Sequence, residues 1–387
     1  MFKYIMSRKY INNIITKFES RCTGPVQLSK EWFAIREKGS RKRGRIGGSD
    51  VATLMDLNPY KTKKQLMREK QGIKKRKVFN SFAMVFGSVF EEVAVGCFEK
   101  TFNTKVHCKN ISIVDPKGYD YMLFSPDGIC ALPIDNGELF IDYDDEAYSK
   151  IKKFVPVLVE IKCPTRRELT EDGDVPVQYY PQLQAGMLSI DIAHSGIFID
   201  NQIRVCSYQD LYEGSAINNK IHEKCRAIEE DTEPINIGAF LVYGDLPTNI
   251  NKQYIKKELI GDKKVYDYGN CYNSTFTHIL TACRDNLVRV EFLNPCDDVD
   301  ELDIVDKIRN SKEEHIGIVC WKLFDVSYTV VNKNISFING IVKELDNYHQ
   351  GVYDLDEEPE EIVMEKKSTT MPVEPPPRLS FDSDSSS

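Results

Sequence analysis

Two charged residues lie inside a strand that is otherwise apolar. Residues 155–165 read VPVLVEIKCPT, and Glu160 and Lys162 point to one face of this strand while Ile161 points to the other. Burying a carboxylate and an ammonium costs several kcal/mol unless both are paired, and pairing usually does no more than offset that cost. Neighbours two positions apart on one strand are poorly placed to pair. A divalent cation bound beside them explains both charges better.

Asp127 supplies another carboxylate, at the end of an expected strand. It stands in the sequence SPDG, which by itself is an ordinary turn. Together with Glu160, however, it would offer the hard oxygen ligands that Mg²⁺ and Mn²⁺ prefer. Lys162 would then face the same site and polarise a water or stabilise a developing charge.

A long helix, expected over about residues 81–102, carries two adjacent acids. At about 100° per residue, one face of this helix is apolar, and it consists of Phe82, Phe86, Phe90, Val93, Ala94 and Cys97. Glu92 falls nearly opposite this face and is expected to be solvated. Glu91 falls at its border, so Glu91 is the acid that can face the interior.

The basic residues are concentrated in the first part of the chain. The net charge is −8, yet residues 1–110 hold 24 Lys+Arg and 9 Asp+Glu, and the remainder holds 27 and 50. Such asymmetry is typical of a polyanion-binding face, although a solvated basic surface would look the same. Two short clusters, RKRGR at 41–45 and KKRK at 74–77, could each be a nuclear address or a phosphate-contacting loop.

The composition argues against secretion and against a membrane span. We find no apolar run of about 18 residues, and the cationic N-terminus lacks the apolar core of a signal peptide. The 11 cysteines contain no C-x-x-C pair. A disulfide framework is therefore not expected, and a zinc or iron–sulfur site built from distant cysteines is the weaker alternative. We expect an intracellular, reducing compartment.

The remaining patterns predict a mixed α/β protein. A helix capped by Ser49 or Asp50 is expected to end before Pro59, and a short one follows over 61–72. Strands are expected over 106–114, 119–124 and 155–162, then a helix over 177–190 and strands over 194–200 and 203–208. The order of helix, three strands, helix and strand indicates the α/β class.

The motifs, taken together, resemble a known family. SPDG followed by VEIKCP resembles the PD-(D/E)xK nuclease signature. RIGGSDVATLMDLNPY, FGSVFEEVA and YYPQLQ look like the YqaJ-like viral recombinase group, which includes the lambda-type alkaline exonucleases. The resemblance covers roughly residues 28–208 in five motifs and suggests a large DNA virus as the source. It implies a restriction-endonuclease-like α/β core, with a central mixed sheet flanked by helices.

The resemblance also implies roles for particular residues. One or two Mg²⁺ ions, with Mn²⁺ as a substitute, would lie in an active site made of Asp127, Glu160, the carbonyl of Ile161, Lys162, Glu91 and Gln182. Ser49, with Arg43 or Arg45, would bind a 5′-phosphate. Tyr179 and Gln184 would contact DNA elsewhere.

The implied activity is a 5′-to-3′ exonuclease that digests double-stranded DNA ends in viral recombination or replication. A single-strand annealing protein and further copies of the chain are the implied partners, in the host cytoplasm or nucleus. Two alternatives stay open. One is a structure-specific or restriction-like endonuclease with the same core, and the other is a DNA-binding or assembly protein whose nuclease site is vestigial.

The chain is expected to divide into five parts. A helical extension over 1–27 precedes the nuclease core at 28–208, and an insertion or accessory region of unknown role follows at 209–315. A strand and a helix over 316–354 would complete the core. The acidic, proline-rich and serine-rich tail at 355–387 is expected to be disordered.

Overall fold

The structure is a computed structural model that describes most of the chain. The described residues are 7–38, 43–74, 81–135, 138–139, 153–169, 174–229, 232–248, 250, 252–295 and 303–355. The predicted disordered tail beyond Leu355 and most of the KKRK cluster lie outside them. Within them, no helix is both long and apolar enough to cross a membrane.

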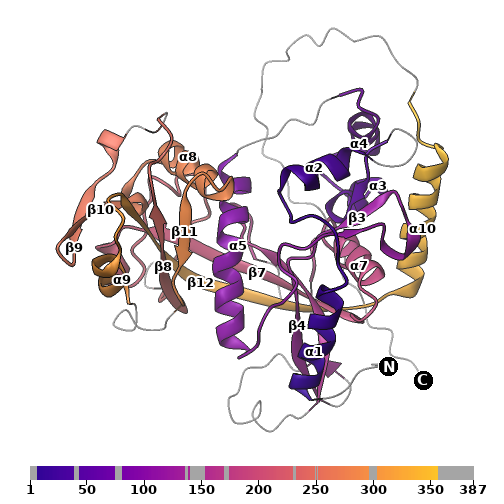
Figure 1. The fold of residues 1–387 in the computed structure, drawn as a ribbon, viewed down its shortest axis with the longest axis horizontal. Helices are drawn as coiled ribbons and strands as arrows, with labels where there is room; N and C mark the ends of the chain where they lie inside the picture. The colour runs from indigo at the N-terminus through magenta and orange to yellow at the C-terminus, as the bar shows by residue number, and fades with distance from the viewer. Residues whose placement is uncertain are drawn as a thin grey trace.

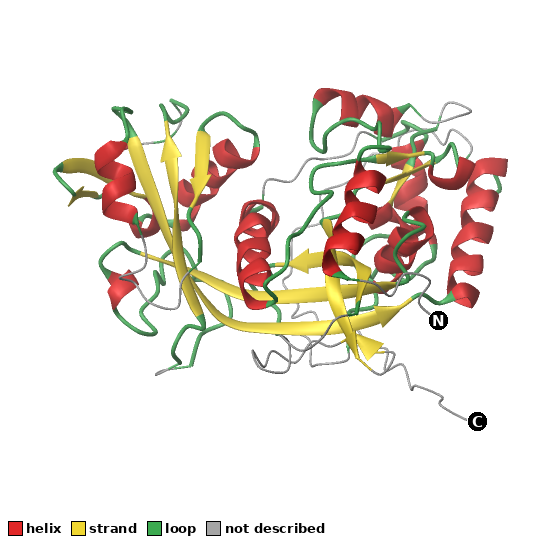
Figure 2. Ribbon diagram, turned by 60° about the horizontal axis from the view of Figure 1, so that its bottom comes forward, coloured by secondary structure: helices red, strands yellow, loops and turns green. Residues whose placement is uncertain are grey.

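A mixed sheet forms the centre of the molecule. The apolar strand with the two charges is β6 (Phe154–Lys162). It pairs antiparallel with β4 (Gly128–Asp135) and parallel with β7 (Ser195–Cys206). The described strands of this sheet follow the order β11-β8-β12-β7-β6-β4-β5, where β5 is Glu138–Leu139. The sheet continues from one side of the molecule to the other (Figure 2).

The longest strand joins the two ends of this sheet. β12 (Ile316–Asn332) pairs antiparallel with all of β7, and its first half also pairs with β8 (Asn236–Tyr243). The strands β11 (Arg289–Phe292), β10 (Lys263–Asp267) and β9 (Lys257–Ile260) extend the sheet around β8 and β12 (Figure 1). Strands from the 209–315 region therefore share one hydrogen-bonded sheet with β6.

Helices cover both faces of the sheet because the strand side chains alternate between two apolar clusters. Val155, Val157, Val159 and Ile161 of β6 pack with α5 (Phe82–Thr101) and α8 (Asn273–Arg284). Phe154 and Leu158 pack on the opposite face with α7 (Tyr180–Ser189) and α1 (Arg8–Glu19). The even-numbered Glu160 and Lys162 are thereby directed to the face that α7 covers.

A small second sheet carries the basic N-terminal segment. It has the order β1-β3-β2, with β1 at Ile46–Gly47, β3 at Met122–Phe124 and β2 at Ile113–Val114. Around it lie α2 (Lys30–Glu37), α3 (Val51–Leu54) and α4 (Lys63–Lys70), and α10 (Ile335–Gln350) packs against α7 and α3. The remaining helix, α9 (Ile304–Asn310), lies near β9.

The mixed α/β class and the order of helix, strands, helix and strand are confirmed, with three corrections. β4, which follows the SPDG turn, was not predicted, although it is the neighbour of β6 in the main sheet. The two strands predicted before it shrink to β2 and β3 and belong to the small sheet. The helix predicted after Ser49 is only the single turn α3, because the chain turns at Asp56 with a φ of 59°.

Candidate active site

The ammonium of Lys162 lies among three oxygen groups at the end of β6. Its Nζ donates hydrogen bonds to Glu160 Oε1 and, over 2.8 Å, to the carbonyl of Ile161. Asp127 Oδ2 is 3.5 Å from the same nitrogen and accepts a 2.8 Å hydrogen bond from the Ile161 N–H. Glu160 and Lys162 therefore do pair directly, which corrects the expectation that same-strand neighbours could not.

Burial perturbs both members of this ion pair. Glu160 is fully buried, and its Oε2 has no hydrogen-bond partner. Burial, and next the charge of Asp127, raise the pKa of Glu160 to about 7 although Lys162 acts in the opposite direction. Burial alone would lower the pKa of Lys162, but Glu160 and Asp127 together hold it well above its usual range. Lys162 is therefore an ammonium, and it does not balance all the negative charge around it.

Glu91 adds a third carboxylate from the helix α5. Burial raises the pKa of Glu91 well above its ordinary value, and the charges of Asp127 and Glu160 raise it further. Cys163 Sγ lies 3.5 Å from the carbonyl of Phe90, which holds this turn of α5 against the end of β6. Glu92, by contrast, is exposed and forms a 2.6 Å ion pair with Lys109.

The charges and donor atoms of this site fit a divalent cation. Asp127, Glu160 and Glu91 face the single ammonium of Lys162, which leaves an excess of two negative charges when all are ionised. Oxygen is the donor that Mg²⁺ and Mn²⁺ prefer, and the free Oε2 of Glu160 is available as one more ligand atom. As they stand, no three His, Cys, Asp or Glu side chains in the described part of the chain are arranged to hold a metal ion. Lys162 occupies the space among the oxygens.

Two side chains of the α7 segment lie on the side of the sheet that bears Glu160 and Lys162. The ring of Tyr179, at the start of α7, has its centroid 5.3 Å from Lys162 Nζ. Gln182 follows one helical turn later, half-buried, on the same side of α7. Both residues thus lie on the helix that covers the face of β6 with the charges.

Comparison with known proteins adds to this geometry. Residues 31–192, which contain all of these side chains, match the YqaJ-like viral recombinase domain. This part of the chain, less than half of its length, is therefore similar to the YqaJ-like viral recombinase domain. The expected resemblance to that family is confirmed.

Relatives of the YqaJ-like domain occur in viruses and in bacteria. Protein D345L of African swine fever virus (strain Badajoz 1971 Vero-adapted) is 34% identical over 203 residues, which cover 51% of this chain and 56% of D345L. The uncharacterized protein YqaJ of Bacillus subtilis is 33% identical over 97 residues, 25% of this chain and 28% of YqaJ. The match thus spans about half the length of D345L.

One solved structure resembles this chain more distantly. It is the alkaline exonuclease LHK-Exo from Laribacter hongkongensis, with 19% identity and a TM-score of 0.29 over 45% of this chain and 74% of that one.

Arg167 and Asp200 lie next to the site around Lys162, called the YqaJ-like site below, although neither was predicted. The Arg167 guanidinium forms two hydrogen bonds with the carboxylate of Asp200, one of them 2.7 Å long, and lies 5.9 Å from the ring of Tyr179. Asp200 is fully buried in β7, directly opposite Lys162 in the strand register. The sequence signal was present, since Asp200 is an acid at the end of the apolar run HSGIFID.

The predicted DNA contact at Gln184 is wrong. Its side chain is fully buried, its amide nitrogen donates to the carbonyl of Asn332 over 2.8 Å, and its amide oxygen accepts from the Asn334 N–H over 2.9 Å. Both ends of the amide therefore bind the segment between β12 and α10. An amide that is fully buried and bound at both ends is out of reach of DNA.

Arg43 and Arg45 are also committed to protein contacts. Arg45 pairs with Asp115 at 2.9 Å and donates to the carbonyl of Ile35, also at 2.9 Å. Arg43 donates to the last carbonyls of α10, at Tyr348 and His349, and pairs with Asp354. These bonds hold the N-terminal segment to its neighbours, as the contacts of Arg36 with Asp50 and Trp32 also do. A phosphate would have to displace protein contacts at any of the three arginines.

Arg36 is the arginine that lies beside the turn of Ser49. Ser49 is exposed. The carboxylate of Asp50 accepts a 3.1 Å hydrogen bond from the Gly47 N–H and forms ion pairs with Arg36, over 3.3 Å, and Lys70, over 2.7 Å. Burial alone would raise the pKa of Asp50, but Lys70 and Arg36 lower it below its usual range.

Trp32 connects Arg36 to the turn that carries Asp127. The guanidinium of Arg36 lies 4.7 Å from the Trp32 ring, and Trp32 Nε1 donates to Ser125 Oγ over 3.1 Å. Ser125 stands two residues before Asp127. Sequence reasoning missed Arg36 because ten residues separate it from the Gly-Gly-Ser motif.

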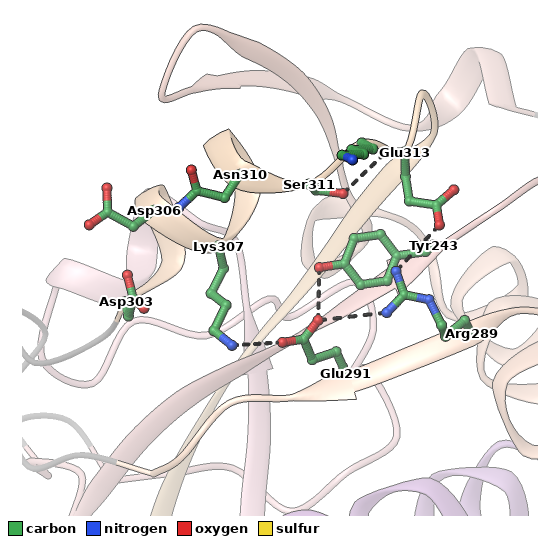
Figure 3. Close-up of a pocket in the computed structure, with 10 residues that line it drawn as sticks. Tyr243, Arg289, Glu291, Asp303, Asp306, Lys307, Asn310, Ser311 and Glu313 are labelled. Carbon is green, nitrogen blue, oxygen red and sulfur yellow. Dashed lines mark hydrogen bonds and ion pairs between the residues drawn. The ribbon is translucent and has the colours of Figure 1, made fainter.

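A separate pocket of about 510 Å³ lies at the far end of the sheet, and none of the predicted site residues lines it (Figure 3). Four of its charged side chains are paired with one another. Lys307 contacts Glu291 at 2.9 Å, and Arg289 contacts Glu313 at 3.4 Å. We assign it no part in the chemistry of the YqaJ-like site.

Proposed function

We propose that this chain is a metal-dependent deoxyribonuclease that digests double-stranded DNA ends from the 5′ side during viral recombination or replication. One observation carries the proposal. Inside a YqaJ-like domain, three carboxylates and one lysine are gathered at the end of a strand where folding alone would avoid them. Perturbed charges of this kind are typical of functional sites.

Each residue of the cluster has a role in this proposal. Asp127, Glu160, Glu91 and the carbonyl of Ile161 would hold Mg²⁺, or Mn²⁺ in its place, and the cation would stabilise charge on the scissile phosphate. Lys162 would orient or deprotonate the attacking water.

Gln182 and Tyr179 complete the proposed site from α7. Gln182 would hold the phosphate or Lys162 from one side. Tyr179, whose ring already lies against Lys162, would contact the DNA backbone.

Recognition of a 5′-phosphate is proposed for Ser49 and Arg36. Ser49 is exposed, and Arg36 lies beside the same turn. Through Trp32 and Ser125, Arg36 is also linked to the turn that carries Asp127. A guanidinium can bind a terminal phosphate through two parallel hydrogen bonds. The short helix α3 adds little to this site, because a single turn has a weak dipole.

Digestion of linear duplex DNA tests the proposal. The duplex would be labelled at either the 5′ or the 3′ end and incubated with and without Mg²⁺, with covalently closed circular DNA in parallel. We expect Mg²⁺-dependent loss of the 5′ label first and no cutting of the circles. Cutting of closed circles would favour the endonuclease alternative, and no cutting of any substrate would favour the vestigial one.

Assembly, compartment and domain division stay predictions. A homo-oligomer would allow the DNA to be held during repeated cuts, and an annealing protein would take up the single strand that is left. Light scattering of the purified chain, alone and with DNA, would measure the first. No disulfide joins any two of the ten cysteines in the described part of the chain.

A further inference from the structure

A segment of the 209–315 region lies against the loop that follows the catalytic strand. The backbone N–H of Arg226 donates to the carbonyl of Thr165 over 3.2 Å. Thr165 is three residues after Lys162, and the exposed Arg166 comes next. The backbones that carry Arg166 and Arg226, from distant parts of the sequence, are thereby brought together shortly after the end of β6.

Buried side chains hold this segment in place. Arg204 of β7 is fully buried and donates to the carbonyls of Ile203 at 2.8 Å and Arg226 at 3.1 Å. His222 is buried as well, and its Nε2 accepts from the Val205 N–H at 2.7 Å while its Nδ1 lies 3.4 Å from Cys225 Sγ. The position of Arg226 is therefore set by the protein and is not that of a free surface loop.

The charges around this segment leave an excess of cations. Burial, and next the charge of Arg204, lower the pKa of His222 to about 3, so the ring is neutral. Glu168 lies 3.4 Å from Arg226, but both side chains are largely exposed, at 64% and 45%. Glu223 and Glu229 lie on the segment itself, together with Lys220 and Lys224. Asp200, an acid of β7, is fully buried and bound by Arg167. Among the described residues, no carboxylate contacts Arg204, and its Nε is buried without a hydrogen-bond partner.

We infer that Arg166 and Arg226 form a second phosphate subsite, which binds a backbone phosphate of the DNA strand next to the bond that is cut. The inference rests on the proposed nuclease function and deepens it, since it gives the 218–226 segment a part in holding the substrate. Arginines bind phosphate through paired hydrogen bonds, and backbone phosphates supply most of the affinity that does not depend on sequence. The exposed ion pair with Glu168 is weak enough for a phosphate to displace it.

Binding measurements on the full chain test this subsite without relying on cutting. The background substitution is Glu160→Gln, which keeps the shape of the side chain, and no divalent metal is added. Arg166→Ala and Arg226→Ala are compared by the fluorescence anisotropy of a short fluorescein-labelled duplex at several salt concentrations. Each is expected to weaken binding about tenfold. Each should also reduce the slope of log K against log salt by about 0.7 to 0.9.

Arg289→Ala is the matched control. Arg289 is 55% exposed and lies 3.4 Å from Glu313, which is 46% exposed, so its ion pair resembles that of Arg226 and Glu168 but stands in the distant pocket of Figure 3. Its substitution should leave both affinity and salt slope unchanged.

The outcomes separate this inference from the proposed function. If Arg166→Ala and Arg226→Ala bind DNA as Arg289→Ala does, the subsite is refuted even if the unsubstituted chain cuts DNA. If they bind more weakly than the control but the unsubstituted chain never cuts, the nuclease proposal fails and the phosphate subsite stands. A chain that does not bind DNA at all overturns both.

Discussion

Replacing Lys162 by methionine should leave the carboxylates at the end of β6 without the positive charge that offsets them. Methionine keeps much of the side-chain length but removes the ammonium that contacts Glu160 and the carbonyl of Ile161 and lies 3.5 Å from Asp127. At that distance a pair of unit charges interacts by about 5 kcal/mol with an effective dielectric constant near 20. Removing one partner of a buried pair typically costs about 3–5 kcal/mol.

We therefore expect Lys162→Met to lose measurable nuclease activity and to lower the melting temperature by about 4–6 °C. Thermal unfolding followed by circular dichroism would measure the second effect. Added Mg²⁺ should raise the melting temperature of the variant more than that of the unsubstituted chain. The carboxylates would then have lost their competing ammonium, and a cation that binds only the folded state stabilises it.

Lys109→Met is the control for this experiment. Lys109 pairs with Glu92 at 2.6 Å on the surface of α5, where such a pair contributes about 0–1 kcal/mol. A Lys162→Met protein that melts like Lys109→Met, or that still cuts DNA at the original rate, would refute the charge-balance argument.

Three further outcomes follow from the structure. Glu91→Ala should slow DNA cutting by about 100-fold or more, whereas Glu92→Ala should leave the rate unchanged; equal rates would contradict the placement of Glu91. Removal of residues 356–387 should leave the cutting rate intact because that acidic segment would repel DNA, and a folded but inactive truncation would count against this. Arg36→Ala should abolish any preference for 5′-phosphorylated over 5′-hydroxyl duplexes in a digestion assay, while Arg45→Ala keeps it if folded; the reverse result would return the phosphate site to Arg45.

The central strand and helix of the site could be predicted from the sequence. Glu160 and Lys162 stood out because charges are rare inside an apolar strand, and Glu91 was distinguished from Glu92 by helical spacing alone. Both arguments depend only on local geometry, in which a period of two or of 3.6 residues decides the face of each side chain. They needed no knowledge of the partner elements.

The partners of long polar side chains could not be predicted in this way. Arg36 lies beside the Ser49 turn, whereas Arg43 and Arg45 bind other parts of the protein. The side-chain amide of Gln184 binds the backbone of the segment that joins β12 to α10. β4 was missed because its Gly-Ile-Cys-Ala-Leu-Pro run has no polar alternation, as expected for a strand covered on both faces.

The sequence by itself determined the faces on which Glu160, Lys162 and Glu91 lie, because burial of an apolar face forces nearby charges into a definite direction. Only the tertiary structure decided what those residues meet. The segment around Arg226 reaches the loop after Lys162 across some 60 positions of sequence, through Arg204 and His222. A guanidinium or amide on a long side chain takes whichever partners the fold brings within hydrogen-bond distance, and distance along the chain does not determine them.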